Sequence, residues 1–134
     1  MRSVLVLIAG VVMLLSSLAH GLVGWPMMRG LLRDGGAGED LIGALAVGWY
    51  FGSVAMVAFG SIAIVAALRL RRGDRSGVAP GRLIALCYVL FGLAAFLSRG
   101  FNPHFLLFVA TGLLAGLPLS GGAAVRRGPG PGAS

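Results

Sequence analysis

The chain has 134 residues, of which 57% are hydrophobic and 11% are charged. A soluble domain typically carries about 25% charged residues, so this composition, with a mean hydropathy of +0.94, excludes an ordinary soluble domain and indicates an integral membrane protein. The formal net charge of +7 comes from arginines that lie mostly between the apolar runs. We interpret it as a signal of membrane orientation and predict no nucleic-acid partner.

Four apolar runs define the predicted architecture. A bilayer core about 30 Å thick needs about 20 apolar residues per helix. The runs therefore predict an all-α fold, an integral membrane four-helix up-and-down bundle that forms a single domain over residues 1–120. The predicted helices cover residues 3–25, 41–68, 82–98 and 103–120. The Gly- and Pro-rich residues 121–134 are predicted to be a disordered cytoplasmic tail.

The first apolar run permits two interpretations. Arg2, the apolar stretch and the small residues Ser17-Leu18-Ala19 resemble a secretory signal, and cleavage there would make His20 the mature N-terminus. The apolar character continues to Trp25, however, and exceeds the h-region of about 7–15 residues that a signal peptide has. This length favours an uncleaved helix, in which residues 1–19 are retained.

The segment after this run is predicted to leave the membrane. Pro26 lacks a backbone N–H and cannot easily continue a helix, so we expect the first helix to end there. Residues 27–32 alternate Met, Leu and Arg as in a short interfacial turn. A Gly-rich link then leads to Glu39 and Asp40, whose carboxylates suit the first turn of the second helix.

Small residues recur at four-residue spacing in two of the predicted helices. They are Ala44, Gly48 and Gly52 in the second helix, and Gly112 and Gly116 in the fourth. This spacing lets helix backbones approach closely in lipid, either within one chain or between chains. With 23 glycines in the chain, composition alone is the alternative explanation.

Five polar residues near the outer ends of the predicted helices form the candidate site. They are His20, His104, Arg99, Ser16 and Ser17. Ser16, Ser17 and His20 share one side of the first helix by their spacing, and ionisable groups at membrane depth usually face a bundle interior or a wet cavity. The functional interpretation is a small polar pocket open to the outer side. The structural interpretation is that interfacial water satisfies both histidines and that Arg99 anchors to lipid headgroups.

The sequence contains no catalytic, nucleotide-binding or metal-binding motif, so we assign no enzymatic activity. Two histidines on different helices can ligate one haem iron, but such a site needs both at matching depth, and no supporting pattern accompanies them. The single cysteine, Cys87, lies in the third run and forms neither an intrachain disulfide nor a Cys-based metal site. We predict no cofactor and no metal.

The arginines divide unequally between the two ends of the predicted helices. Eight of the eleven lie before the first run, between the second and third runs, or after the fourth, and three lie on the other side. Short cytoplasmic loops are enriched in Lys and Arg. Both termini and the loop 69–82 are therefore predicted to be cytoplasmic, whereas residues 26–40 and 99–104 are predicted to face outward.

The segment "AHGLVGWP" followed by "GALAVGWYFGSVAMVAFG" resembles a pattern in small four-helix bacterial membrane proteins that have no assigned activity. The resemblance covers roughly the first half of the chain. It implies a bundle in the bacterial inner membrane, and it carries over no activity and no site residue.

The leading functional prediction is a non-enzymatic accessory or interaction protein of the lipid bilayer. Its glycine-lined helices would pack against a second copy, as a homo-oligomer, or against a larger membrane complex. Two other classes stay open. One is a protein that binds a small molecule, a quinone or haem, or that handles protons, at the polar cluster around His20. The other is a subunit of an oligomeric small transporter.

Overall fold

Residues 1–120 are described by the computed structural model, and they form helices joined by short turns. In chain order these are α1 (Arg2–Ala19), the π-helical turn η1 (His20–Gly24), α2 (Trp25–Asp34), α3 (Glu39–Arg71), α4 (Val78–Ser98), the 3-10 turn η2 (Pro103–Phe105) and α5 (Leu106–Ser120). No strand occurs within these residues. The predicted tail, residues 121–134, lies outside the described part of the chain.

Four helical segments of the described chain are long and apolar enough to cross a membrane, which confirms the all-α four-helix prediction. They are Arg2–Asp34, Glu39–Arg71, Val78–Ser98 and Pro103–Ser120. The first two have 33 residues each, whereas the third and fourth have 21 and 18. At about 1.5 Å per residue, the first two are about 50 Å long and the others about 30 Å. The bundle therefore combines two long helices with two that match the thickness of a bilayer core.

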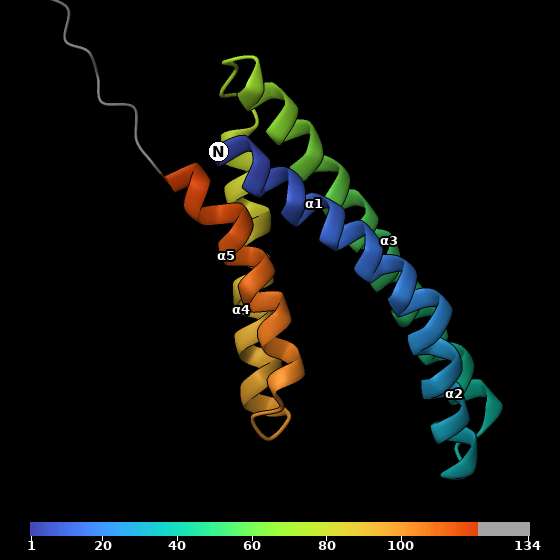
Figure 1. The fold of residues 1–134 in the computed structure, drawn as a ribbon. Helices are drawn as coiled ribbons and strands as arrows, with labels where there is room; N and C mark the ends of the chain where they lie inside the picture. The colour runs from blue at the N-terminus through green and yellow to red at the C-terminus, as the bar shows by residue number, and fades with distance from the viewer. Residues whose placement is uncertain (121–134) are drawn as a thin grey trace, which may run out of the picture.

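The helices pair into two hairpins (Figure 1). In the first hairpin α1, η1 and α2 pack along α3, and in the second α4 packs along α5. The hairpins meet where α1 lies against α5, at the end that holds the start of α1 and the α3–α4 loop. From there they diverge, so that α2 and the α4–α5 turn are separated. The chain runs up and down through four helices, and the resulting bundle is splayed.

The first helix does not end at Pro26, and this boundary of the predicted helix 3–25 is wrong. Pro26 is the second residue of α2, and the helix continues to Asp34. The reason is the register of η1, in which the N–H of Trp25 donates to the carbonyl of His20, five residues earlier. Pro26 thus falls at the start of a new α-helical segment, where a missing N–H is tolerated.

The backbones of α1 and α3 touch at Gly10 and Gly60, which are both buried. A Cβ at Gly10 would lie 2.9 Å from the carbonyl oxygen of Gly60, and a Cβ at Gly60 would lie 2.8 Å from the carbonyl oxygen of Gly10. Side chains at these positions would push the helices apart. The first hairpin therefore depends on glycine at both sides of one contact.

The second hairpin is closed in the same way. A Cβ at Gly92 of α4 would lie 2.8 Å from the backbone nitrogen of Val109. A Cβ at Gly112 of α5 would lie 2.7 Å from the carbonyl oxygen of Ala85. Close backbone packing of this kind stabilises helix pairs in lipid, where apolar burial alone gives no drive between helices.

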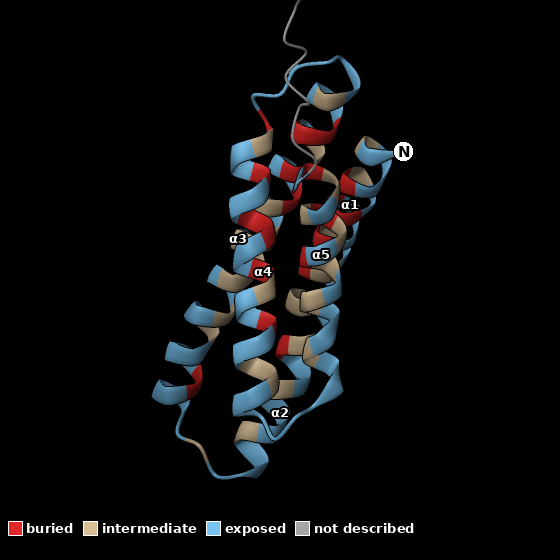
Figure 2. Ribbon diagram, turned by 90° about the vertical axis from the view of Figure 1, so that its left-hand side faces the viewer, coloured by how far each residue is buried: buried red, intermediate tan, exposed pale blue. Residues whose placement is uncertain are grey.

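Buried residues lie on parts of the helices that face one another (Figure 2), and many of them are small. One cluster of buried residues joins both hairpins: Ala9, Met13, Ala63, Ile84, Ala85, Tyr88 and Ala115. Many large apolar side chains point outward, and Leu22, Val47 and Phe51 are each more than 70% exposed, at 73%, 73% and 74%. This distribution suits helices whose outer surface meets lipid tails.

Tyr88 places one polar atom in this interior. The side chain is buried and packs against Phe59 and Phe108. Its hydroxyl has no hydrogen-bond partner among the described residues. A buried unpaired hydroxyl destabilises a fold by roughly 1–3 kcal/mol, so the ring of Tyr88, and not its hydroxyl, stabilises this position.

The glycine contact between α1 and α3 generates a stability prediction. Gly60→Ala places a methyl group against the Gly10 carbonyl and Leu14, so the free energy of unfolding in detergent should fall by about 1–3 kcal/mol relative to a matched control. The control is Gly48→Ala in the same helix, because a Cβ at Gly48 has no atom within 4 Å. Both variants gain the same helix propensity. Equal thermal unfolding of the two variants would contradict the backbone contact.

Candidate functional site

The candidate site is built around the change of helical register at His20. In η1 the carbonyl of His20 accepts the N–H of Trp25. The same carbonyl accepts a second hydrogen bond, at 2.7 Å, from the indole Nε1 of Trp49 in α3. A carbonyl oxygen has two lone pairs and can hold both donors. The π-helical turn is thereby fixed to the neighbouring helix.

Aromatic rings pack around this carbonyl and form a group that we call the aromatic cluster: His20, Trp25, Trp49 and Tyr50. The imidazole of His20 stacks on the ring of Trp49 with the centroids 4.2 Å apart and the planes 2° from parallel. Trp25 packs at a tilt against Trp49, with centroids 5.8 Å apart, and against Tyr50, at 6.1 Å. The cluster joins η1 and the start of α2 to the first half of α3.

Three glycines lie beside the aromatic cluster and Ser53, and Gly24 has the tightest surroundings of the three. A Cβ at Gly24 would lie 3.0 Å from Cζ2 of Trp49, and a Cβ at Gly52 would lie 3.6 Å from Nε2 of His20. A Cβ at Gly21 would lie 3.5 Å from the hydroxyl of Ser53. Both glycines of "HGLVG" and the second glycine of "GWYFG" therefore lie beside this site.

A serine contact lies about one turn from the aromatic cluster. The Ser17 hydroxyl donates to the Ser53 carbonyl at 2.8 Å, and Ser17 is buried. Ser16, its neighbour, is half-buried. Hydrogen bonds between membrane helices contribute about 0.6 kcal/mol on average, so this contact supplements the glycine packing rather than replacing it.

The five residues of the predicted polar pocket are divided between the two hairpins. Ser17 and His20 lie against α3. Arg99 is exposed at the end of α4, and His104 is exposed in η2, where its ring meets the edge of Phe105. η1 packs on α1, α2 and α3, whereas η2 packs on α4 and α5. Because the hairpins diverge toward this end (Figure 1), the structure does not bring all five residues together.

The small residues predicted for helix packing also have different surroundings. Gly112 and Gly116 of α5 both face α4, where a Cβ at Gly116 would lie 3.0 Å from Cβ of Ala85. Gly52 faces His20. Ala44 is exposed, and Gly48 is exposed with no atom within 4 Å of an added Cβ. Ala44 and Gly48 are therefore not part of the contact between α1 and α3.

No cluster of three or more His, Cys, Asp or Glu side chains suited to a metal ion occurs among residues 1–120. The two histidines lie on separate hairpins. One face of the His20 ring is covered by Trp49. His20 forms an aromatic contact between helices, and the structure does not bring the two histidines together as a pair of haem ligands.

Sequence reasoning missed Trp49, Tyr50 and Ser53 as members of the site. The small residues of "GWYFG" indicate a packing surface, and the polar residues near His20 in the predicted fold are Ser16, Ser17, Arg99 and His104. The order of the helices does indicate that Trp49 can lie near the first helix. Trp49 belongs to the next helix in the chain, and consecutive helices joined by a short link usually pack side by side. Because the predicted link of residues 26–40 is too long, the alignment of His20 with Trp49 cannot be obtained from it.

Comparison of the chain with protein-family models, with curated proteins and with solved structures gave no match. The resemblance to small four-helix bacterial membrane proteins therefore stays a prediction.

The indole hydrogen bond at His20 gives a second stability prediction. Trp49→Phe keeps an aromatic ring beside His20 but removes the Nε1–H donor, so the free energy of unfolding should fall by about 1 kcal/mol more than in the control. The control is Trp25→Phe, because the Trp25 indole donates to no described residue. Thermal unfolding in detergent measures the difference. A loss as large in Trp25→Phe as in Trp49→Phe would show that the hydrogen bond adds nothing beyond ring packing.

Proposed function

We propose that the protein is a non-enzymatic accessory or interaction protein of the bacterial inner membrane. In this proposal its helices pack against a second copy of the chain or against a larger membrane complex. The observation that carries the proposal is the outward face of α3 around Ala44 and Gly48, which has no partner within the described chain. The bacterial membrane itself is supported only by the resemblance of the first half of the sequence.

The surroundings of Gly48 distinguish it from the other regularly spaced glycines. Gly52, Gly112 and Gly116 each have a neighbouring atom close to an added Cβ, and Gly48 has none. Glycine inside a helix costs about 1 kcal/mol relative to alanine. A second helix that approached Ala44 and Gly48 would offset this cost by close backbone packing. Lipid tails at the same face would not, since they pack equally well against larger side chains.

The extent of burial supports the same proposal. In the most apolar window of each span, 28% of the residues are buried for the first three spans and 17% for the fourth. Most of the surface of these helices is therefore available to lipid or to another protein. The diverging ends of the hairpins add to this surface, because α2 packs on η1 and α3 whereas η2 packs on α4 and α5 (Figure 1).

The alternative function at His20 receives less support. Proton handling or the binding of a small molecule at this position would need a polar pocket, and His20 instead stacks on Trp49 while Arg99 and His104 lie on the other hairpin. No specific observation favours a transporter subunit. We therefore propose the interaction role alone.

The interaction proposal is tested at Gly48. Native mass spectrometry of the gently extracted protein should detect a homo-oligomer or a stoichiometric partner, and Gly48→Leu should reduce that species severalfold, because a large side chain blocks close helix approach. The matched control is Ala94→Leu, which enlarges an exposed small residue on α4. A wild-type protein that is monomeric and without a partner after mild extraction would contradict the proposal, as would assemblies that Gly48→Leu leaves unchanged.

We also propose that the end of the bundle with the α3–α4 loop faces the cytoplasm, so that both termini are cytoplasmic. The described arginines Arg2, Arg69, Arg71, Arg72, Arg75 and Arg82 belong to this end. Arg29, Arg33 and Arg99 belong to the other end, and the excess supports the orientation through the preference of Lys and Arg for cytoplasmic loops.

Reporter fusions test this orientation. Fusions after Arg72 and after Ser134 should both report a cytoplasmic location, and a fusion after Gly36 should report the opposite side. A periplasmic signal at either of the first two positions would refute the proposed topology.

A further inference from the structure

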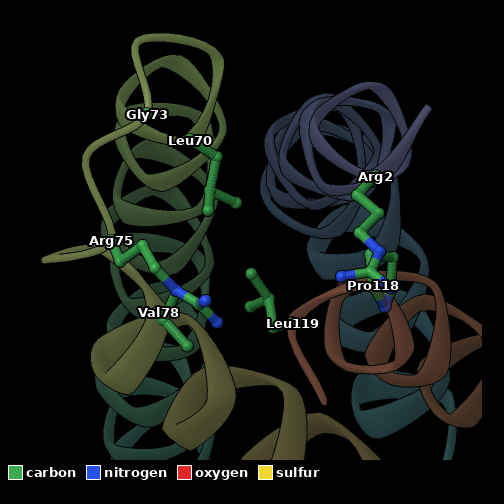
Figure 3. Close-up of a pocket in the computed structure, with 7 residues that line it drawn as sticks. All are labelled: Arg2, Leu70, Gly73, Arg75, Val78, Pro118 and Leu119. Carbon is green, nitrogen blue, oxygen red and sulfur yellow. The ribbon is translucent and has the colours of Figure 1, made fainter. Parts of the chain in front are cut away.

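A cavity with a volume of about 260 Å³ lies near the arginine-rich end. It lies between the start of α1, the α3–α4 loop and the end of α5 (Figure 3). Four of its lining residues are apolar: Leu70, Val78, Pro118 and Leu119. Two others, Arg2 and Arg75, are cationic. They reach toward the cavity from opposite sides, with Leu119 between them (Figure 3).

One wall of the cavity is held in place by a third arginine. Arg82 donates from Nε and from Nη2 to the carbonyl oxygen of Leu119, at 3.1 and 2.6 Å. These two bonds join α4 to the last described turn of α5. Leu119 itself is buried in a cluster with Val6 and Ala67. The apolar wall is therefore formed by ordered residues of several helices.

The charge around the cavity is strongly positive. Six arginines of the described chain lie at this end, and Asp74 is the only acidic residue in the α3–α4 loop. The backbone N–H and the hydroxyl of Ser76, with Arg69 nearby, hold the pKa of the Asp74 carboxyl below its usual range. That single carboxylate is thus already engaged with Ser76. Residues 121–134 contain two arginines and no Asp or Glu, so they supply no acidic side chain to balance the charge.

A cavity with this positive charge suits an anion, and its position indicates which kind. It lies where apolar helices end, which is the depth of lipid headgroups in a bilayer. Guanidinium groups bind phosphate oxygens with two parallel hydrogen bonds, and basic pockets between membrane helices on the cytoplasmic side are suited to anionic headgroups. The apolar wall matches the glycerol and the first carbons of an acyl chain. A free inorganic anion would make no use of that wall.

We propose that this cavity binds the headgroup of an anionic phospholipid from the surrounding leaflet, with Arg2 and Arg75 on its phosphate and the wall of Leu70, Val78 and Leu119 against its glycerol and upper acyl carbons. This site is independent of the proposed interaction face on α3. It joins α1 to the α3–α4 loop at the end where the two hairpins meet, so the bound lipid would connect segments that are far apart in sequence.

Native mass spectrometry with added phosphatidylglycerol or phosphatidylcholine tests the proposal. The wild-type protein should retain phosphatidylglycerol at least about tenfold more strongly than phosphatidylcholine, and replacing both cavity arginines by glutamine (R2Q with R75Q) should abolish most of this preference. The control pair is R71Q with R72Q, which removes the same charge from the same end but does not line the cavity. Equal losses in the two pairs would show general attraction to a positive surface and would overturn the proposal, as would equal retention of the two lipids.

Two further measurements separate the remaining explanations. Val78→Phe fills the cavity without changing any charge, so it should weaken phosphatidylglycerol retention. This variant tests the cavity even if the protein with both glutamine substitutions does not insert into the membrane. Unchanged retention in this variant would overturn the assignment to the cavity. Millimolar inorganic phosphate should compete poorly, because it lacks the apolar part. Full displacement by phosphate would show that the ligand is a soluble anion and not a lipid.

Discussion

The contact between Gly10 and Gly60 sets the geometry on which the rest of the first hairpin depends. In lipid, the separation of two helices is set by what stands between their backbones, because no water has to be expelled when they meet. With no side chain on either glycine, the carbonyl oxygen of each lies where a Cβ on the other would collide with it. This fixes both the distance and the register of the two helices, and the serine and aromatic contacts further along follow from it.

The contacts of Ser17 and of the aromatic cluster depend on this alignment of α1 with α3. The hydroxyl of Ser17 reaches Ser53, and the carbonyl of His20 reaches the indole of Trp49, only because the helices are already close. The π-helical turn supplies a carbonyl that points toward α3 at the correct place. π-Helical turns are often associated with functional sites. Here the turn is joined to α3 by the hydrogen bond from Trp49 to the His20 carbonyl and by the stacked rings of His20 and Trp49.

The sequence predicted the helical architecture because hydropathy depends on composition over about 20 residues, a property that local errors do not change. It did not predict the path of the chain at Pro26, because the register change that accommodates the proline involves Trp49, which lies on the next helix. With the first helix ending at residue 25, the predicted link covers residues 26–40, whereas residues 35–38 join the two helices in the structure. The position of Trp49 opposite His20 was therefore hidden by a boundary error.

The spacing of small residues predicted packing without specifying the partner. Gly112 and Gly116 meet α4, and Gly52 meets His20, but Gly48 in the same series meets nothing in the described chain. Residues spaced four apart lie only approximately on one side of a helix. A helix has about 3.6 residues per turn, so each further residue of such a series is displaced slightly around the helix axis. Over the length of α3 this rotation separates the face that α1 covers, at Gly60, from the face at Ala44.

The unequal lengths of the hairpins have a consequence for the surface that water can reach. A helix about 50 Å long, even at a tilt of about 40°, extends across about 38 Å and exceeds a hydrocarbon core of about 30 Å. The charged residues of this hairpin gather at the end with α2 and the start of α3: Arg29, Arg33, Asp34, Glu39 and Asp40. The ion pair between Arg33 and Glu39 closes this end at 2.9 Å. Helices of this length contain more residues than a bilayer core requires, and the first hairpin ends in a charged tip that suits contact with water.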